Sequence, residues 1–134
     1  MAVSTVLTVS SADGTTSPPS RTATLTSDTV IRQSFSVDGS TTNQARQIGF
    51  DAANVKFVLI TVSGAVTCKT NSTGSPDHTF AWAAAGCLFW SSEFPAAVAS
   101  PFGSTDVTNT YWTNAGADAV TVVVLIGLNS NPVG

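Results

Sequence analysis

The sequence predicts an all-β fold: an antiparallel β-sandwich, jelly-roll-like, with about eight strands and an extended N-terminal arm. Three observations support this prediction. The chain contains 20 Thr, 17 Ser and 16 Val but only 6 Leu, so strand and turn formers far outnumber good helix formers. Short segments rich in apolar and β-branched residues recur along the chain, separated by clusters of turn-forming residues. A length of 134 residues suits one domain with a substantial core.

The chain divides into an N-terminal arm or linker at residues 1–20 and a β-sandwich domain at residues 21–134. Within the arm, residues 3–9 alternate loosely between apolar and polar side chains and can form a strand. Residues 10–20, SSADGTTSPPS, contain Asp-Gly and Pro-Pro pairs that do not fit a regular element. We therefore expect an arm joined to the domain by a flexible or extended connector.

The domain begins with two predicted strands, a short one at residues 21–26 and a longer one at residues 28–37. In the longer strand, Ile31, Phe35 and Val37 share one face with Gln33, and the other face has the polar residues Arg32, Ser34 and Ser36. Asp38-Gly39-Ser40 predicts a turn. The sequence QARQIGF at residues 44–50 predicts another strand.

The strongest strand signal lies at residues 55–63, where nearly every residue is apolar or β-branched. Both faces of this strand are apolar in the middle, which predicts cover on two sides. Ser63-Gly64-Ala65 predicts a tight turn, because Gly accepts the positive φ that hairpin turns need. Residues 65–70 then predict a returning strand, and a polar loop follows at residues 71–77. We interpret residues 55–70 as a β-hairpin.

A second hairpin is predicted from residues 79–82 and 87–91, which flank a short Ala-Gly segment. Trp82 and Trp90 are placed to meet across it. A helical turn through residues 81–86 is the alternative, because Ala is the best helix former.

A third hairpin is predicted after a Pro-containing surface connection at residues 93–103. Residues 107–114 form its first strand, residues 115–118 turn the chain, and residues 119–128 return. The returning strand is apolar on both faces. It is therefore expected to be central in a sheet or to lie at a subunit interface.

The charge composition argues against nucleic-acid binding. The net charge is −3, and the few basic residues are scattered rather than clustered, as a grip on phosphates would need. These residues are Arg21, Arg32, Arg46, Lys56 and Lys69. Charged residues are 10% of the chain, against the usual ~25%. This suits a subunit packed against copies or partners, and the alternative is a soluble domain solvated by its hydroxyl groups.

Neither a membrane anchor nor a secretory signal is predicted. No apolar run approaches the ~18 residues of a membrane span, and the N-terminus lacks the charged and apolar regions of a signal peptide. We expect synthesis in a cytoplasm, with Cys68 and Cys87 reduced by default. A disulfide between these two cysteines stays possible if their strands face each other.

No catalytic, cofactor-binding or metal-ligating residue is predicted, so the protein is expected not to be an enzyme and to need no cofactor. The single histidine, His78, follows Asp77 in the polar loop, and no second histidine could complete a metal shell. We interpret His78 as a solvated loop residue. The chain has one glutamate, Glu93, which gives no recognisable pair of catalytic carboxylates.

The aromatic residues allow two interpretations. Trp82, Trp90, Trp112 and Tyr111 could form a platform on which sugars stack, as in a carbohydrate-binding module. Aromatic residues on strands are more often core or interface anchors.

Three segments resemble small structural proteins of tailed bacteriophages: TVSGAVTCKTNSTGSPDHTF at residues 61–80, LFWSS at 88–92 and STDVTNTYWTNAGADAVTVVVLIGL at 104–128. The resemblance covers roughly the C-terminal half of the chain and includes no catalytic landmark. It implies a virion protein, either a capsid decoration (cement) protein or a related tail or fibre accessory. Such proteins are commonly small β-sandwiches that assemble as trimers or other symmetric oligomers on the capsid surface.

The resemblance also implies partners and a location. The partners would be the major capsid protein or other virion subunits, together with copies of the chain in a homotrimer or other symmetric homo-oligomer. The location would be the capsid surface of a virion, after synthesis in the host cytoplasm. By analogy, residues 1–20 would contact neighbouring subunits.

Overall fold

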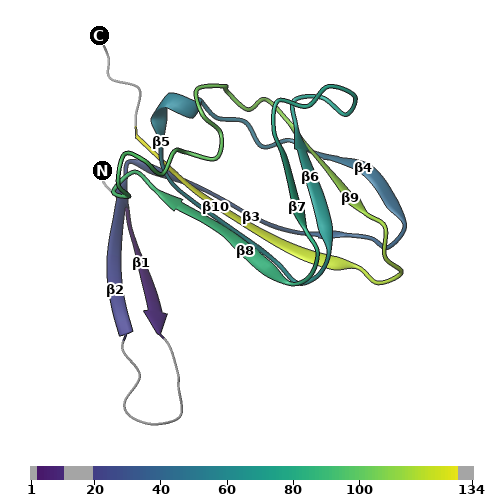
Figure 1. Cartoon of the computed structure of the whole chain (residues 1–134), viewed down its shortest axis with the longest axis horizontal. Helices are drawn as coiled ribbons and strands as arrows, with labels where there is room; N and C mark the ends of the chain where they lie inside the picture. Colours follow the sequence, from purple (N-terminus) through teal and green to yellow (C-terminus); the bar gives the residue numbers. More distant parts are fainter. Residues whose placement is uncertain (1–2, 11–19, 130–134) are drawn as a thin grey trace.

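The structure, a computed structural model, describes residues 3–10 and 20–129. Two four-stranded antiparallel sheets pack as a sandwich, and a two-stranded hairpin projects from one end (Figure 1). The predicted all-β sandwich is therefore confirmed. The first sheet, sheet I, consists in order of β3 (Thr29–Val37), β10 (Val120–Leu128), β5 (Val55–Val62) and β8 (Gly86–Ser91). The second, sheet II, consists in order of β4 (Thr41–Arg46), β9 (Thr110–Asn114), β6 (Val66–Thr70) and β7 (Thr79–Trp82).

The strand order is that of a jelly roll. All connections between successive sandwich strands cross from one sheet to the other, except the connection from β6 to β7. The two-faced apolar strands β5 and β10 lie in the middle of sheet I, flanked by β3 and β8. The predicted central position of the strand at residues 119–128 is therefore confirmed. A short 3-10 helix, η1 (Ala52–Asn54), precedes β5 and was not predicted.

The pairing in all three predicted hairpins is wrong, although their strands exist. β5 and β6, β7 and β8, and β9 and β10 lie in opposite sheets, so the turns between them are corners of the sandwich. β5 shows the physical reason, because β10 and β8 already occupy both of its hydrogen-bonding edges. A returning strand then has no free edge to join and crosses to the other sheet.

The one hairpin between successive sandwich strands is β6–β7, which the polar loop at residues 71–78 connects. The alternative helical turn through residues 81–86 is also wrong, since the chain only bends there before β8 begins. Trp82 and Trp90 accordingly belong to different sheets and do not meet across a hairpin.

The strand predicted at residues 44–50 is wrong beyond Arg46, where β4 ends. Ile48 and Phe50 alternate as in a strand because both are buried in the core, at 2% and 8% exposed. Phe50 meets Val107 through a pair of backbone hydrogen bonds of 2.9 and 3.0 Å. The alternation of apolar and polar residues in this segment is therefore due to the burial of a loop that crosses between the sheets.

The core fills the space between the inner faces of the two sheets. At its centre Trp112 is 1% exposed and meets the ring of Phe35 edge-to-face, with centroids 5.2 Å apart. The indole nitrogen of Trp112 donates to the Thr110 hydroxyl at 2.9 Å, so its one polar atom is satisfied. Arg46 closes one edge of the core, with its guanidinium 4.7 Å from the centre of the Phe35 ring.

The predicted turns at residues 38–40 and 115–118 are confirmed, and they lie together. Asn114, 1% exposed, donates to the carbonyls of Val37 (3.0 Å) and Asp118 (2.7 Å). Gly39 approaches the Ala117 backbone so closely that a Cβ at position 39 would overlap it. One buried amide therefore fastens the two corners together.

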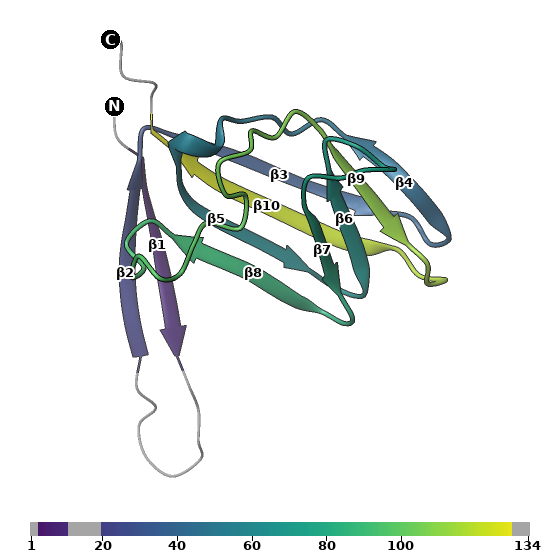
Figure 2. The same cartoon turned by 45° about the horizontal axis from the view of Figure 1, so that its top comes forward.

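The N-terminal hairpin consists of β1 (Val3–Ser10) and β2 (Ser20–Ser27), paired antiparallel from Val3 opposite Ser27 to Ser10 opposite Ser20. Figures 1 and 2 show it extending away from the sandwich. An N-terminal arm is thus present. The linker predicted at residues 10–20 falls almost wholly on 11–19, outside the described residues. The division of the chain at residue 20 stays a prediction.

Candidate interaction surface

The ionisable side chains that could take part in catalysis do not form a reaction centre. Asp77 and His78 lie in the β6–β7 loop, whereas Glu93 follows β8 in the other sheet. No group of three His, Cys, Asp or Glu residues is gathered in the part of the chain that the structure describes. His78 is not a solvated loop residue as expected. It is half-buried beside Phe80 and Phe102, and its Nε2 is buried without a hydrogen-bond partner.

The β6–β7 loop is held by Asn71, whose φ of 68° lies in the left-handed region. Its side-chain amide donates to the carboxylate of Asp77 (2.6 Å) and to the carbonyl of Asp106 (2.8 Å). Its side-chain oxygen accepts from the backbone N–H of Thr108 at 2.7 Å. Asn tolerates this backbone conformation better than most residues, and here it ties two loops together.

The tryptophans do not form one platform. Trp112 is in the core, and Trp82 stacks on it from the edge strand β7, with ring centroids 6.3 Å apart. Trp90, in the other sheet, donates from its indole nitrogen to the Val98 carbonyl at 2.9 Å. Trp82 lines an open groove of about 140 Å³, together with Thr67, Thr113 and four other residues.

The two cysteines are free thiols, so the disulfide that the sequence left possible is not formed. Cys68 is buried on the inner face of sheet II, and burial raises the pKa of its thiol from 9.0 to about 12. Cys87 is exposed on β8, opposite Thr61 of β5. Only Cys87 is therefore available to a reagent in solution.

The outer faces of the two sheets differ in chemistry. The outer face of sheet II is polar, and the strand registers place Tyr111 opposite Lys69, and Lys69 opposite Thr79. On the outer face of sheet I, the equivalent row starts with the exposed Arg32 on the edge strand β3 and continues with Leu125, Leu59 and Phe89, each opposite the next. With Val123, which is 37% exposed, the half-buried Leu125, Leu59 and Phe89 form what we call the apolar stripe.

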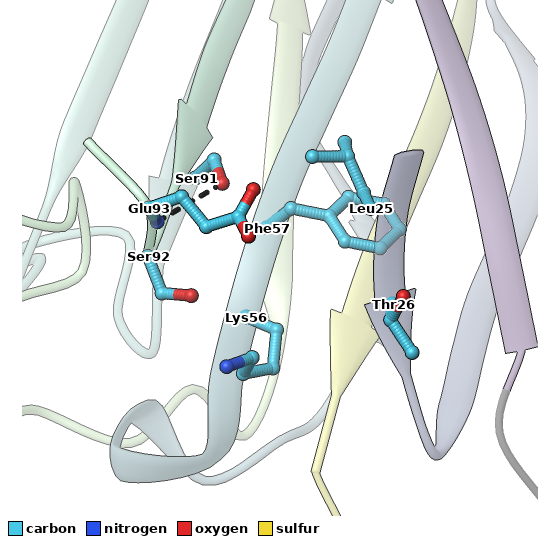
Figure 3. A pocket seen from close by; sticks show the side chains of 7 residues that line it. All are labelled: Leu25, Thr26, Lys56, Phe57, Ser91, Ser92 and Glu93. Atoms are coloured by element: carbon cyan, nitrogen blue, oxygen red, sulfur yellow. Dashed lines mark hydrogen bonds between the residues drawn. The ribbon is translucent and has the colours of Figure 1, made fainter. Parts of the chain in front are cut away.

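The base of the hairpin covers the row next to the apolar stripe. In this row Gly127 pairs with Phe57, and Phe57 with Ser91. The Phe57 ring lies directly over Gly127, where a Cβ would overlap it. Leu25 of β2 lies against Phe57 (Figure 3), and the two side chains are 6% and 1% exposed.

A cavity of about 100 Å³ lies beside this contact, lined by Leu25, Phe57 and five more residues (Figure 3). It contains one cationic side chain, Lys56, and one carboxylate, Glu93, which Figure 3 shows well apart from each other. Glu93 is fixed instead through its backbone N–H, which donates to the Ser91 hydroxyl at 3.2 Å. The cavity marks the junction of hairpin and sandwich.

Exposure rises along the outer face of sheet I with distance from the hairpin. The row of Phe57 is buried, the row of Leu59 is half-buried, and in the next row Val123, Thr61 and Cys87 are all exposed. Successive rows on one face are about 7 Å apart. Sequence reasoning found the apolar outer faces of β5 and β10 but missed Phe89, which joins them through pairing between distant segments.

No helix in residues 3–10 and 20–129 is long and apolar enough to span a membrane. Comparisons with protein-family models, curated proteins and solved structures find no match for this chain. Its class is therefore defined by its architecture, a jelly-roll β-sandwich with a projecting N-terminal hairpin.

Proposed function

We propose that this protein is a non-enzymatic structural component of a phage virion, a capsid decoration (cement) protein that stabilises the head by bridging capsomers. One observation supports this proposal above the others. The chain combines an apolar stripe, half-buried except for the exposed Val123, with a hairpin that projects from the body, and thus offers two surfaces for neighbouring subunits. Contiguous exposed apolar residues on a folded domain are a mark of interaction sites.

The proposed partners are the major capsid protein or other virion subunits, together with copies of this chain in a homotrimer or other symmetric oligomer. The proposed location is the capsid surface. Bridging requires contact area rather than a reaction centre, and a stable protein interface buries roughly 1,200–2,000 Å². Repetition of one small subunit over a symmetric shell supplies such contacts many times. A tail or fibre accessory would use the same two surfaces.

Co-sedimentation with capsids tests the proposal. The purified chain should bind saturably to assembled capsids of the virus that encodes it, bind free coat subunits weakly, and raise the temperature at which the capsids open. Capsids mixed with an unrelated β-sandwich protein provide the control. A chain that remains a stable monomer and ignores capsids would refute the proposal.

A second candidate function, glycan binding in a fibre or spike, is favoured by the groove beside Trp82. A half-buried indole in a groove that Thr67 and Thr113 also line suits the apolar and polar faces of a sugar, although the Thr113 hydroxyl is already hydrogen-bonded to Asn43. Host-surface glycans should then quench tryptophan fluorescence in the native chain and in Trp90→Phe, but much less in Trp82→Ala. Fluorescence that no host glycan changes would rule this candidate out.

A further inference from the structure

The hairpin projects from the sandwich (Figure 2), and most of its side chains that the structure describes are exposed. Two paired strands alone are marginally stable in water, and such a hairpin normally needs a third strand or a packed face. Of its side chains that the structure describes, only Leu25 and Ser27 at the base are buried. Ser4, Val6 and Thr26 are exposed, with Val6 62% exposed. The rest of the hairpin leaves the body (Figure 2).

The apolar stripe is only partly covered, by the ring of Phe94, which meets Phe89 edge-to-face with centroids 5.4 Å apart. The stripe also continues a contact that already exists. The hairpin base covers the first row of the outer face through Leu25 and Phe57. Leu59 follows Phe57 on the same face of β5, with Leu125 and Phe89 beside it. An apolar surface is thus left partly open immediately beside the covered row.

The width of a hairpin is similar to the width of the open part of the face. The open part of the face comprises the row of Leu59 and the row of Thr61, about 7 Å apart. The two strands of a hairpin lie about 4.8 Å apart, so one hairpin spans both rows. The chain's own hairpin is already used at the row of Phe57, so a hairpin over the open rows has to come from another molecule.

We propose that the β1–β2 hairpin of one copy packs on the apolar stripe of a second copy, beside that copy's own hairpin. The proposal rests on the homo-oligomer part of the proposed function and names the surfaces that would form it. The contact joins two different surfaces, so it propagates head to tail, and it gives a ring such as a trimer where the rotation between copies closes. A second copy is the favoured occupant because the same hairpin already packs on the adjoining row of its own face.

Complementation between two full-length variants tests this inference. Val123→Glu places a charge on the stripe and leaves the hairpin intact. Val6→Glu combined with Leu7→Glu places a charge on each face of β1 and leaves the stripe intact. The native chain should be an oligomer by light scattering, and each variant alone a folded monomer. A mixture of the two variants should form a one-to-one complex, because an intact hairpin then meets an intact stripe.

Ala81→Glu, on the exposed outer face of sheet II, is the matched control and should assemble like the native chain. If the double variant does not fold, Val6→Glu alone replaces it, since Val6 is exposed. A monomeric native chain would overturn the inference, as would a variant that still assembles alone. Two variants that never pair would point to stripe-against-stripe packing and also overturn it. Because capsid binding is measured separately, a monomer that binds capsids refutes the inference and leaves the proposed function standing.

Discussion

The two outer faces of the sandwich belong to sheets with similar inner faces, yet they differ in what they present. The outer face of sheet II contains Tyr111, Lys69 and Thr79, which is usual for the solvated side of an antiparallel sheet. At the equivalent row, sheet I has Leu125, Leu59 and Phe89. The difference shows that the two central strands of sheet I present apolar side chains on their solvent-facing side, and that the hairpin covers only one end of this face.

The largest contrast is expected between one aromatic residue from each outer face. Phe57→Ala should lower the free energy of unfolding by about 3–5 kcal/mol, because the ring is 1% exposed and packs against Leu25 and Gly127. Tyr111→Ala should cost only about 1 kcal/mol, since Tyr111 is half-buried. Urea denaturation monitored by circular dichroism measures both. Equal costs would mean that the hairpin does not bury the sheet I face.

A smaller loss is expected at the glycine under Phe57. Gly127→Ala introduces a Cβ that overlaps the Phe57 ring, which then has to move away from the strand. Such overpacking costs about 1–3 kcal/mol, and the displaced ring should also loosen the hairpin. Gly74→Ala is the control, because a Cβ there meets nothing within 4 Å. Thermal unfolding compares the two variants, and the same melting temperature in both would contradict the packing described.

A pH effect is expected from the buried cysteine on the inner side of sheet II. Burial raises the pKa of Cys68 to about 12, above its ordinary value of 9.0. Above pH 9 the unfolded chain loses the thiol proton while the folded chain keeps it, so stability falls as pH rises from 9 towards 12. Between about pH 8 and pH 10 the native chain should lose roughly 1 kcal/mol more stability than Cys68→Ala. Parallel slopes for the two proteins would contradict the burial.

Sequence patterns predicted the strands well because burial of one or both faces leaves a local signature, as in β5 and β10. They could not predict pairing. Gly64 and Gly116 reverse the chain, but a hairpin turn and a sandwich corner need the same local chemistry. Whether β6 joins β5 or crosses to sheet II depends on β10 and β8 having taken the edges of β5. That competition involves segments far apart in the sequence.

The sequence predicted only part of the interaction surface, because pairing between distant strands has no local signature. Apolar outer positions on β5 and β10 follow from alternation within each strand, which pointed to a central strand or a subunit interface. The row of Leu125, Leu59 and Phe89 follows only from the registers between three strands. The buried, unpartnered Nε2 of His78 was likewise invisible, because it depends on Phe102 approaching from another loop.

The most direct test of the central claim, that a second copy covers the apolar stripe, uses the native thiol in the exposed row. Cys87 is exposed in the isolated chain and Cys68 is buried, so a thiol-reactive dye reports on Cys87 alone. The labelling rate of the native chain should fall several-fold as its concentration rises, while that of Val123→Glu stays high throughout. A native rate that is independent of concentration and equal to that of Val123→Glu would contradict the account.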